Sequence, residues 1–138
     1  MSKDAAGYSG TPLIKKLGIK PGQKVMLINP PVGYFDLLGE DLSPQLVKPN
    51  MTPDVVHLFS TSISDLKDKL DQVNALSKKN PLIIIWVSWY KKSAGMSTDI
   101  TEDIIRELAL PKGLVDIKVC AVSDKWSGLK LVVRKTNR

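Results

Sequence analysis

One uncharged run of nine residues, 81–89, constrains the fold of this chain more than any other feature. It opens with a proline, is rich in β-branched and aromatic side chains, and is followed by Lys91 and Lys92. A short run of this composition is typical of a strand buried on both faces, at the centre of a sheet with helices on each side. Nine residues are too few to span a bilayer as a helix. We therefore expect a central strand over residues 82–89 and no membrane partner.

The segments around this run alternate between strand patterns and helix patterns. Apolar residues recur at spacings of three and four over residues 62–79, where Ser62 is the expected helix cap. They recur again after Asp99, which we expect to cap a second amphipathic helix that Pro111 ends. Strands are predicted over residues 24–29, 45–48, 54–59, 82–89, 115–122 and 129–134. The 45–48 segment lies between two prolines, which suits a sheet edge, and the last two strands suit an antiparallel hairpin.

This order predicts an α/β fold with three layers, in which helices cover both faces of a mostly parallel sheet of about six strands. A closing C-terminal antiparallel hairpin on such a sheet matches the methyltransferase-like branch of Rossmann-like folds. The match is an analogy between folds, and it carries no activity with it.

Size and cysteine content predict one domain in a reducing compartment. With 138 residues and 43% hydrophobic content, residues 1–138 suit a single α/β domain, with residues 1–10 as a loose N-terminal arm. The start of the chain lacks the apolar segment of a signal peptide, and Cys120, the single cysteine, cannot form an internal disulfide, so we expect a cytoplasmic protein. One cysteine and one histidine also exclude a Cys/His zinc site within one chain.

The net charge of +6 indicates a solvated surface with a mild basic bias. The lysines are spread along the chain, and aspartates alternate with them over residues 62–79. Interleaved charges of this kind argue against a nucleic-acid-binding helix. Nucleic acid is therefore not an expected partner.

A candidate ligand site follows from the expected sheet. Open α/β sheets bind ligands beyond the carboxyl ends of their strands. If strand 24–29 lies beside strand 54–59, three loops converge there with hydroxyl groups, a helix N-terminus and two lysines. Such a place suits an anion such as a phosphate or a carboxylate. The candidate ligand-binding residues are Asn29, Gly33, Ser60, Ser62, Lys91, Lys92 and Ser93.

The sequence nominates no catalytic residue, no metal ligand and no particular cofactor. Asn29, Pro30 and Pro31 stop a strand, and the loop that they open lacks both G-x-G-x-x-G and a P-loop. His57 falls inside a strand with no nucleophile beside it in sequence, which is typical of a hydrogen-bonded core histidine. Cys120 falls in an apolar strand, which raises the pKa of a thiol and makes it a poor nucleophile.

Several segments also resemble a known family. They are residues 7–13, 15–19, 89–95, 98–102, 113–122 and 126–129, which together span nearly the whole chain. They resemble a family of small bacterial proteins catalogued as a domain of unknown function. The chain departs from the family pattern at Tyr90, where members tend to carry a proline. The resemblance implies a small cytoplasmic bacterial protein, and it supplies no catalytic residues.

Two functional hypotheses lead, ahead of a structural or interaction protein that acts through an edge strand or a dimer face and, last, a nucleic-acid-binding protein. The first is a domain that binds a partner or a small anionic ligand at the carboxyl ends of its strands, without catalysis. The alternative is a minimal or degenerate S-adenosylmethionine-dependent methyltransferase-like protein. Against the alternative, strand 45–48 ends in Lys48, where a ribose-binding carboxylate is expected. The identity of the partner and a homodimer both stay open.

Overall fold

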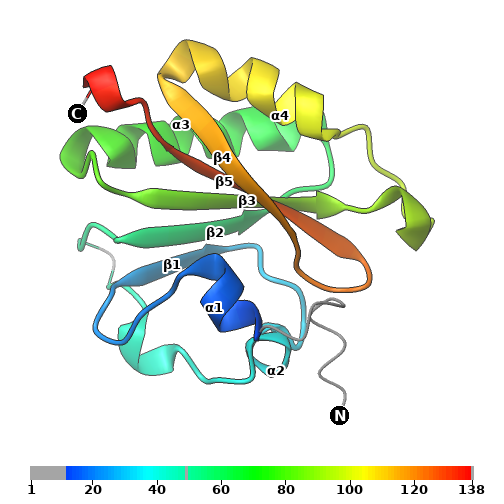
Figure 1. Ribbon diagram of the computed structural model, residues 1–138, viewed down its shortest axis with the longest axis horizontal. Coiled ribbons are helices and arrows are strands. Elements are labelled where there is room, and N and C mark those ends of the chain that lie inside the picture. The colour runs from blue at the N-terminus through cyan, green and yellow to red at the C-terminus, as the bar shows by residue number, and fades with distance from the viewer. Residues whose placement is uncertain (1–11, 49, 138) are drawn as a thin grey trace.

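The computed structural model describes residues 12–48 and 50–137 (Figure 1). The expected N-terminal arm lies outside these residues. Five strands form one sheet in the order β1-β2-β3-β5-β4. Their bounds are β1 Val25–Ile28, β2 Val55–Phe59, β3 Ile84–Tyr90, β4 Leu114–Ala121 and β5 Trp126–Val133. β1, β2 and β3 pair in parallel, whereas β5 is antiparallel to both β3 and β4. Four strands therefore run in one direction, and β5 runs in the opposite direction. β1 lies beside β2, as expected.

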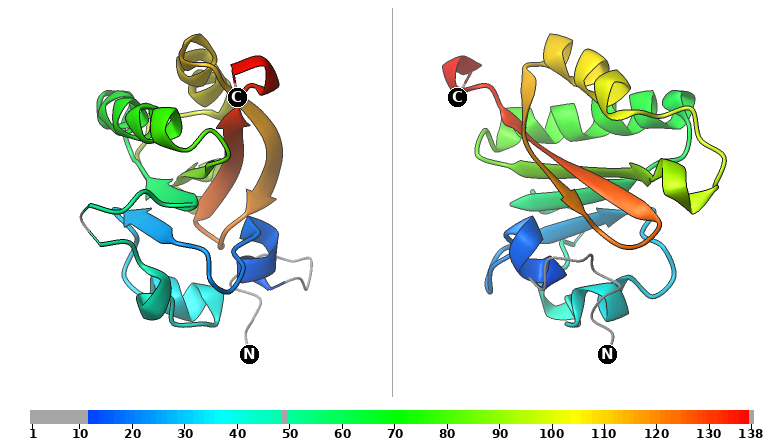
Figure 2. Two further views of the ribbon diagram at one scale, coloured as in Figure 1. Left: turned by 90° about the vertical axis from the view of Figure 1, so that its left-hand side faces the viewer. Right: turned by 45° about the vertical axis from the view of Figure 1, so that its right-hand side comes forward.

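Helices cover both faces of this sheet (Figure 2). The short helices α1 (Leu13–Leu17) and α2 (Tyr34–Leu38) pack on one face, and α3 (Ile63–Lys79) and α4 (Glu102–Ala109) pack on the other. The described residues also include the 3-10 turns η2 Ser43–Gln45, η3 Lys92–Ala94, η4 Leu110–Lys112 and η5 Lys135–Asn137. In the part of the chain that the structure describes, no helix has the length and apolar character needed to cross a membrane.

Both faces of β2 and β3 are apolar because alternate residues serve opposite helix layers. Val56 and Leu58 pack under α3 and α4, while Val55 and Phe59 pack under α1 and α2. All five residues of β2 are buried, and so are the five central residues of β3. The uncharged run that dominates the sequence is thus the central strand, as predicted.

The prediction of about six strands was wrong by one among the described residues. Residues 43–45 form the 3-10 turn η2, and Leu46 makes a single parallel bridge to Val25 at the outer edge of β1. Pro44 lies in the first turn of η2, and a proline has no N–H to offer a neighbouring strand. The segment that was expected to form a strand therefore pairs with β1 only through the bridge from Leu46 to Val25.

The Leu46 bridge still matters for the path of the chain. After β1, the chain crosses to the outer edge of the sheet at Leu46 and then returns to β2 on the opposite side of β1. The direction of travel across the sheet therefore reverses at β1. In open α/β folds this reversal is where the connections leaving two adjacent strands separate and open a crevice.

A side-chain hydroxyl caps each of the two longer helices. Ser62 caps α3, accepting a hydrogen bond from the Asp65 N–H at 3.2 Å, as predicted. The second helix begins at Glu102 and is capped by Thr101, not by Asp99 as expected. Asp99 instead accepts a hydrogen bond from the N–H of Ile63 at 2.8 Å. The Asp99 carboxylate therefore ties the segment before α4 to the first turn of α3.

A buried hydrogen bond holds α1 on the sheet. The indole Nε1 of Trp86, in the middle of β3, donates to the carbonyl oxygen of Leu17 at 2.8 Å. Trp86 is fully buried, so no water can replace this bond. On neighbouring β5, a Cβ on Gly128 would lie 3.2 Å from the indole Cε3, so a side chain at this position would press on the ring.

We predict that Trp86→Phe costs more stability than Trp89→Phe. Both changes remove a similar amount of indole surface, but only Trp86→Phe strands a buried carbonyl oxygen, that of Leu17. The stranded group adds about 1–3 kcal/mol to the loss. Urea unfolding of the two variants measures the difference. Equal losses would mean that the Trp86–Leu17 hydrogen bond contributes nothing.

Candidate functional site

The carboxyl ends of β1, β2 and β3 meet at one edge of the sheet, because these strands are parallel (Figure 1). The turn between β4 and β5 reaches the same edge, since Tyr90 at the end of β3 pairs with Trp126 at the start of β5. The N–H of Lys91 donates to the carbonyl oxygen of Lys125 at 2.9 Å. This bond joins the loop after β3 to the β4–β5 turn.

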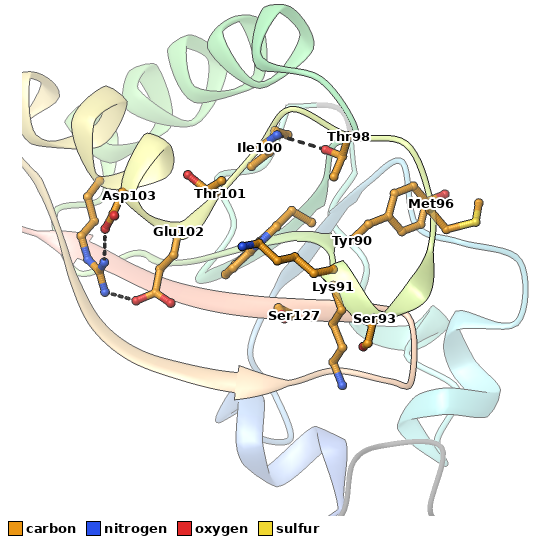
Figure 3. Close-up of a pocket in the computed structure, with 13 residues that line it drawn as sticks. Tyr90, Lys91, Ser93, Met96, Thr98, Ile100, Thr101, Glu102, Asp103 and Ser127 are labelled. Atoms are coloured by element: carbon orange, nitrogen blue, oxygen red, sulfur yellow. Dashed lines mark hydrogen bonds and ion pairs between the residues drawn. The ribbon is translucent and has the colours of Figure 1, made fainter.

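A cleft of about 980 Å³ lies beyond the end of β3 (Figure 3). One wall is the loop that carries η3, and the opposite wall is the segment that leads into α4. Ser127 on β5 also lines it. Its lining residues are Trp89, Tyr90, Lys91, Lys92, Ser93, Met96, Thr98, Ile100, Thr101, Glu102, Asp103, Arg106 and Ser127.

Arg106 organises the α4 wall of the cleft. Its Nε donates to Asp116 at 2.8 Å and its Nη1 to Asp103 at 3.0 Å, while Nη2 pairs with Glu102. Hydrogen bonds to Asp116 and then to Glu102 raise the pKa of the guanidinium further above its ordinary value. The carboxylates of Glu102 and Asp103 thus form ion pairs with Arg106, which lies on the same wall of the cleft.

Three of the seven predicted site residues lie together in this cleft. Lys91, Lys92 and Ser93 all line it, and Figure 3 shows Lys91 between the η3 loop and the start of α4. Gly33 lies elsewhere: it precedes α2 with φ of 82° and lines two smaller clefts near the end of β1. Asn29 is exposed with φ of 54° and lines neither of those clefts nor the large one.

Ser60 and Ser62 are committed to the first turn of α3. The Ser60 hydroxyl is buried and donates to Asp65 Oδ2 at 2.6 Å, and the Ser62 hydroxyl accepts from the Asp65 N–H. Burial of Asp65 opposes its ionisation, but hydrogen bonds from Lys69 and Ser60 outweigh that effect and hold the pKa of the carboxyl below its usual range. Both serines therefore serve the start of this helix.

The cleft also contains residues that the sequence did not nominate. Thr98 and Thr101 stand at its α4 wall, where Thr98 Oγ1 donates to the Thr61 carbonyl oxygen and Thr101 Oγ1 accepts the Ile104 N–H. Their position just before an amphipathic helix was a usable signal. Arg106 and Ser127 gave no such signal, because α4 and β5 reach the cleft only through tertiary packing.

His57 is a core histidine, as predicted. Its Nδ1 lies 2.7 Å from the Tyr34 hydroxyl and its Nε2 lies 2.7 Å from the Ser88 hydroxyl. In either tautomer one ring nitrogen donates and the other accepts, so both are satisfied. His57 and Ser88 are fully buried, and neither lines the cleft at the end of β3. Ser88, the hydrogen-bond partner of His57 on the neighbouring strand, lies 31 residues away in the sequence, so the sequence could not identify it.

Cys120 and the acidic residues offer no further chemistry. Burial raises the pKa of the Cys120 thiol against the opposing effect of Lys16, Lys118 and Lys91, which keeps the thiol protonated. Among residues 12–48 and 50–137, no group of three His, Cys, Asp or Glu side chains is arranged to hold a metal ion.

Comparison with solved structures identifies the fold. A protein of the NADB-Rossmann superfamily from Streptococcus agalactiae matches with a TM-score of 0.58 at 8% identity, over 90% of this chain and 68% of that one. The magnesium protoporphyrin IX methyltransferase ChlM of Synechocystis PCC 6803, solved with bound SAM, matches with a TM-score of 0.54 at 14% identity. The match covers 88% of this chain and 74% of that one. The dimethyltransferase RosA of Streptomyces davawensis matches with a TM-score of 0.52 at 12% identity, over 82% of this chain and 43% of that one.

At such identities these matches concern the fold alone, which is Rossmann-like and found in methyltransferases. No protein-family model matches the sequence. No curated protein matches it either.

The pH dependence of stability follows from His57. Burial lowers the pKa of His57 from 6.5 to about 3. Between these values the unfolded chain binds a proton that the native state excludes, so stability falls as the pH drops, by up to about 1.4 kcal/mol per unit. We predict that His57→Gln, whose amide can still reach hydroxyl groups, has a shallower slope than wild type from pH 6 to 4 in urea titrations. Carboxylates contribute to both slopes equally, and equal slopes would contradict the prediction.

Proposed function

We propose that this chain is a binding domain that holds a small anionic ligand in the cleft at the carboxyl end of β3. The observation that carries the proposal is the placement of Lys91, Lys92 and Ser93 together on one wall of that cleft. The cleft also lies at the edge of the sheet where Rossmann-like folds bind their ligands.

The charges around the cleft support an anion more than a cation. Lys91 and Lys92 bring two ammonium groups to the η3 wall. The acidic side chains on the opposite wall, Glu102 and Asp103, are paired with Arg106. That wall is also the N-terminal end of α4, where the helix dipole favours negative charge. A phosphate or a carboxylate would therefore meet its favourable charges on the η3 wall, where Lys91 and Lys92 lie opposite the Arg106-bound carboxylates.

The same contacts favour binding without catalysis. Catalysis of acyl or phosphoryl transfer generally needs a nucleophile beside a base of suitable pKa. Within the described part of the cleft, the carboxylates are held by Arg106. His57 and Ser88, which do form a hydroxyl–imidazole pair, are fully buried outside it. The proposal is accordingly a binding site and not an active site.

The segments that resemble the small bacterial family include two walls of this cleft. Residues 89–95 carry the η3 wall, and residues 98–102 lie in the segment that leads into α4. We extend the proposal to that family: its members would use the same loop to hold an anion.

A second candidate is a minimal or degenerate methyltransferase-like protein that binds S-adenosylmethionine. The similarity of its fold to that of a methyltransferase solved with bound SAM favours it. Two features weigh against it. The loop after β1 runs from Asn29 through two prolines to Gly33 without a glycine-rich turn. The bridge at Leu46 is followed by Lys48, at the place where dinucleotide-binding Rossmann folds carry a ribose-binding acid.

For the anion site, we predict that Lys91→Ala/Lys92→Ala abolishes stabilisation by inorganic phosphate. A ligand at a hundred times its Kd stabilises the native state by about 2.7 kcal/mol, and the melting temperature of wild type should rise accordingly. Lys78→Ala/Lys79→Ala removes the same charge from the exposed end of α3 and is the matched control. Chloride at equal ionic strength corrects for salt. Equal shifts in both double variants would refute the proposed site.

For the second candidate, calorimetric titration with S-adenosylhomocysteine provides the test. We expect no saturable heat at millimolar concentration, because the loop after β1 lacks the glycines that let a backbone approach such a ligand closely. Saturable binding that is lost in Gly33→Val would place the cofactor at the end of β1. Methyltransferase-like chemistry would then replace the proposed function.

A further inference from the structure

A second, more apolar cleft adjoins the large one. A cleft of about 410 Å³ lies between the loop after β1 and the β4–β5 turn. Tyr90 and Met96 line both clefts, so the two share a boundary at the end of β3. One molecule could therefore occupy both.

The shared boundary carries an ordered stack of aromatic rings. Tyr90 stacks on Trp126 with ring centroids 4.2 Å apart and an interplanar angle of 28°. Trp126 in turn meets Phe59 edge to face at 5.0 Å. Trp126 is 8% exposed and Phe59 is 2% exposed, whereas Tyr90 is half-buried. Tyr90 is thus the outermost ring of a stack anchored in the core, and its orientation is held from below.

Apolar surface surrounds this ring in the second cleft. Val32, from the loop after β1, is fully exposed, and Met96 is 45% exposed. Both line the second cleft together with Tyr90. A planar apolar group lying on Tyr90 would cover these side chains, and burying such surface is favourable by the hydrophobic effect.

The charged groups around the junction are mostly cationic. Lys125 lines the second cleft, and its carbonyl oxygen accepts the N–H of Lys91. Lys91 and Lys92 line the first cleft next to Tyr90. Asp124 is the acidic residue that lines the second cleft. Apart from Glu102 and Asp103, which are paired with Arg106 on the α4 wall, three lysines and one aspartate line the two clefts, and this balance favours a ligand that carries negative charge beside its apolar part.

We propose that the ligand of this domain is a planar aromatic anion that spans both clefts. Its ring lies on Tyr90 in the second cleft, and its anionic group, a phosphate or a carboxylate, lies against Lys91 and Lys92 in the first. The inference rests on the proposed function, which supplies the anion site, and adds the chemical class of the molecule.

Three matched probes separate the two parts of the inference. They are 1-naphthyl phosphate, methyl phosphate and 1-naphthol, titrated against the full chain by calorimetry. We expect 1-naphthyl phosphate to bind at least about tenfold more tightly than either of the others, in keeping with the energy of stacking on an aromatic side chain. Tyr90→Leu should remove the advantage over methyl phosphate, and Tyr90→Phe should retain it. Circular dichroism and melting temperature verify the fold of each variant.

Each contrary outcome identifies the part that fails. Equal affinity for 1-naphthyl phosphate and methyl phosphate would overturn the aromatic class and leave the proposed anion site standing. Equal affinity for 1-naphthyl phosphate and 1-naphthol would overturn the proposed function and, with it, the inference. Binding of none of the three probes would overturn both. An advantage that survives Tyr90→Leu would overturn the assignment of the ring to Tyr90.

Discussion

The burial of β3 on both faces is the constraint on which the rest of the structure depends. β3 pairs in parallel with β2 on one side and antiparallel with β5 on the other, so it joins the two parts of the sheet. Its residue Trp86 holds α1 through the Leu17 carbonyl. Its carboxyl end carries Tyr90 and leads into the lysine-bearing turn η3. The candidate site is therefore an extension of a strand that is buried on both faces.

A row of three hydrogen-bonded side chains, Tyr34, His57 and Ser88, crosses this apolar core, and both ring nitrogens of His57 have a hydrogen-bond partner. His57 sits between the hydroxyls of Tyr34 and Ser88, and its ring stacks on Phe59 with centroids 4.3 Å apart. Phe59 also supports Trp126, which supports Tyr90. The histidine thus contributes to the site from a distance, by fixing the base of the aromatic stack, although it has no route to a ligand.

The sheet follows the Rossmann-like arrangement at β1, whereas the candidate site lies beyond a different strand, β3. The sheet keeps the reversal at β1, but the strand outside β1 is reduced to the Leu46 bridge. The loop after β1 is correspondingly stiff with proline and ends at a five-residue helix, α2. Meanwhile the cleft of about 980 Å³ lies beyond β3, beside the antiparallel strand β5. The ligand site proposed for this chain therefore lies beyond β3 and not beyond the first strand.

The sequence by itself determined the α/β class, the central strand and the cap at Ser62, because these follow from local patterns of apolar and capping residues. It also indicated Lys91, Lys92 and Ser93 as members of one loop. It overestimated pairing at residues 45–48, since a β-like composition says nothing of whether a partner strand is within reach. Only the tertiary structure decided that Ser60 and Ser62 serve α3 while Tyr90 and Ser127 face the cleft. The reason is physical: those contacts join residues from different elements, and only the packing of the sheet brings them within reach of one another.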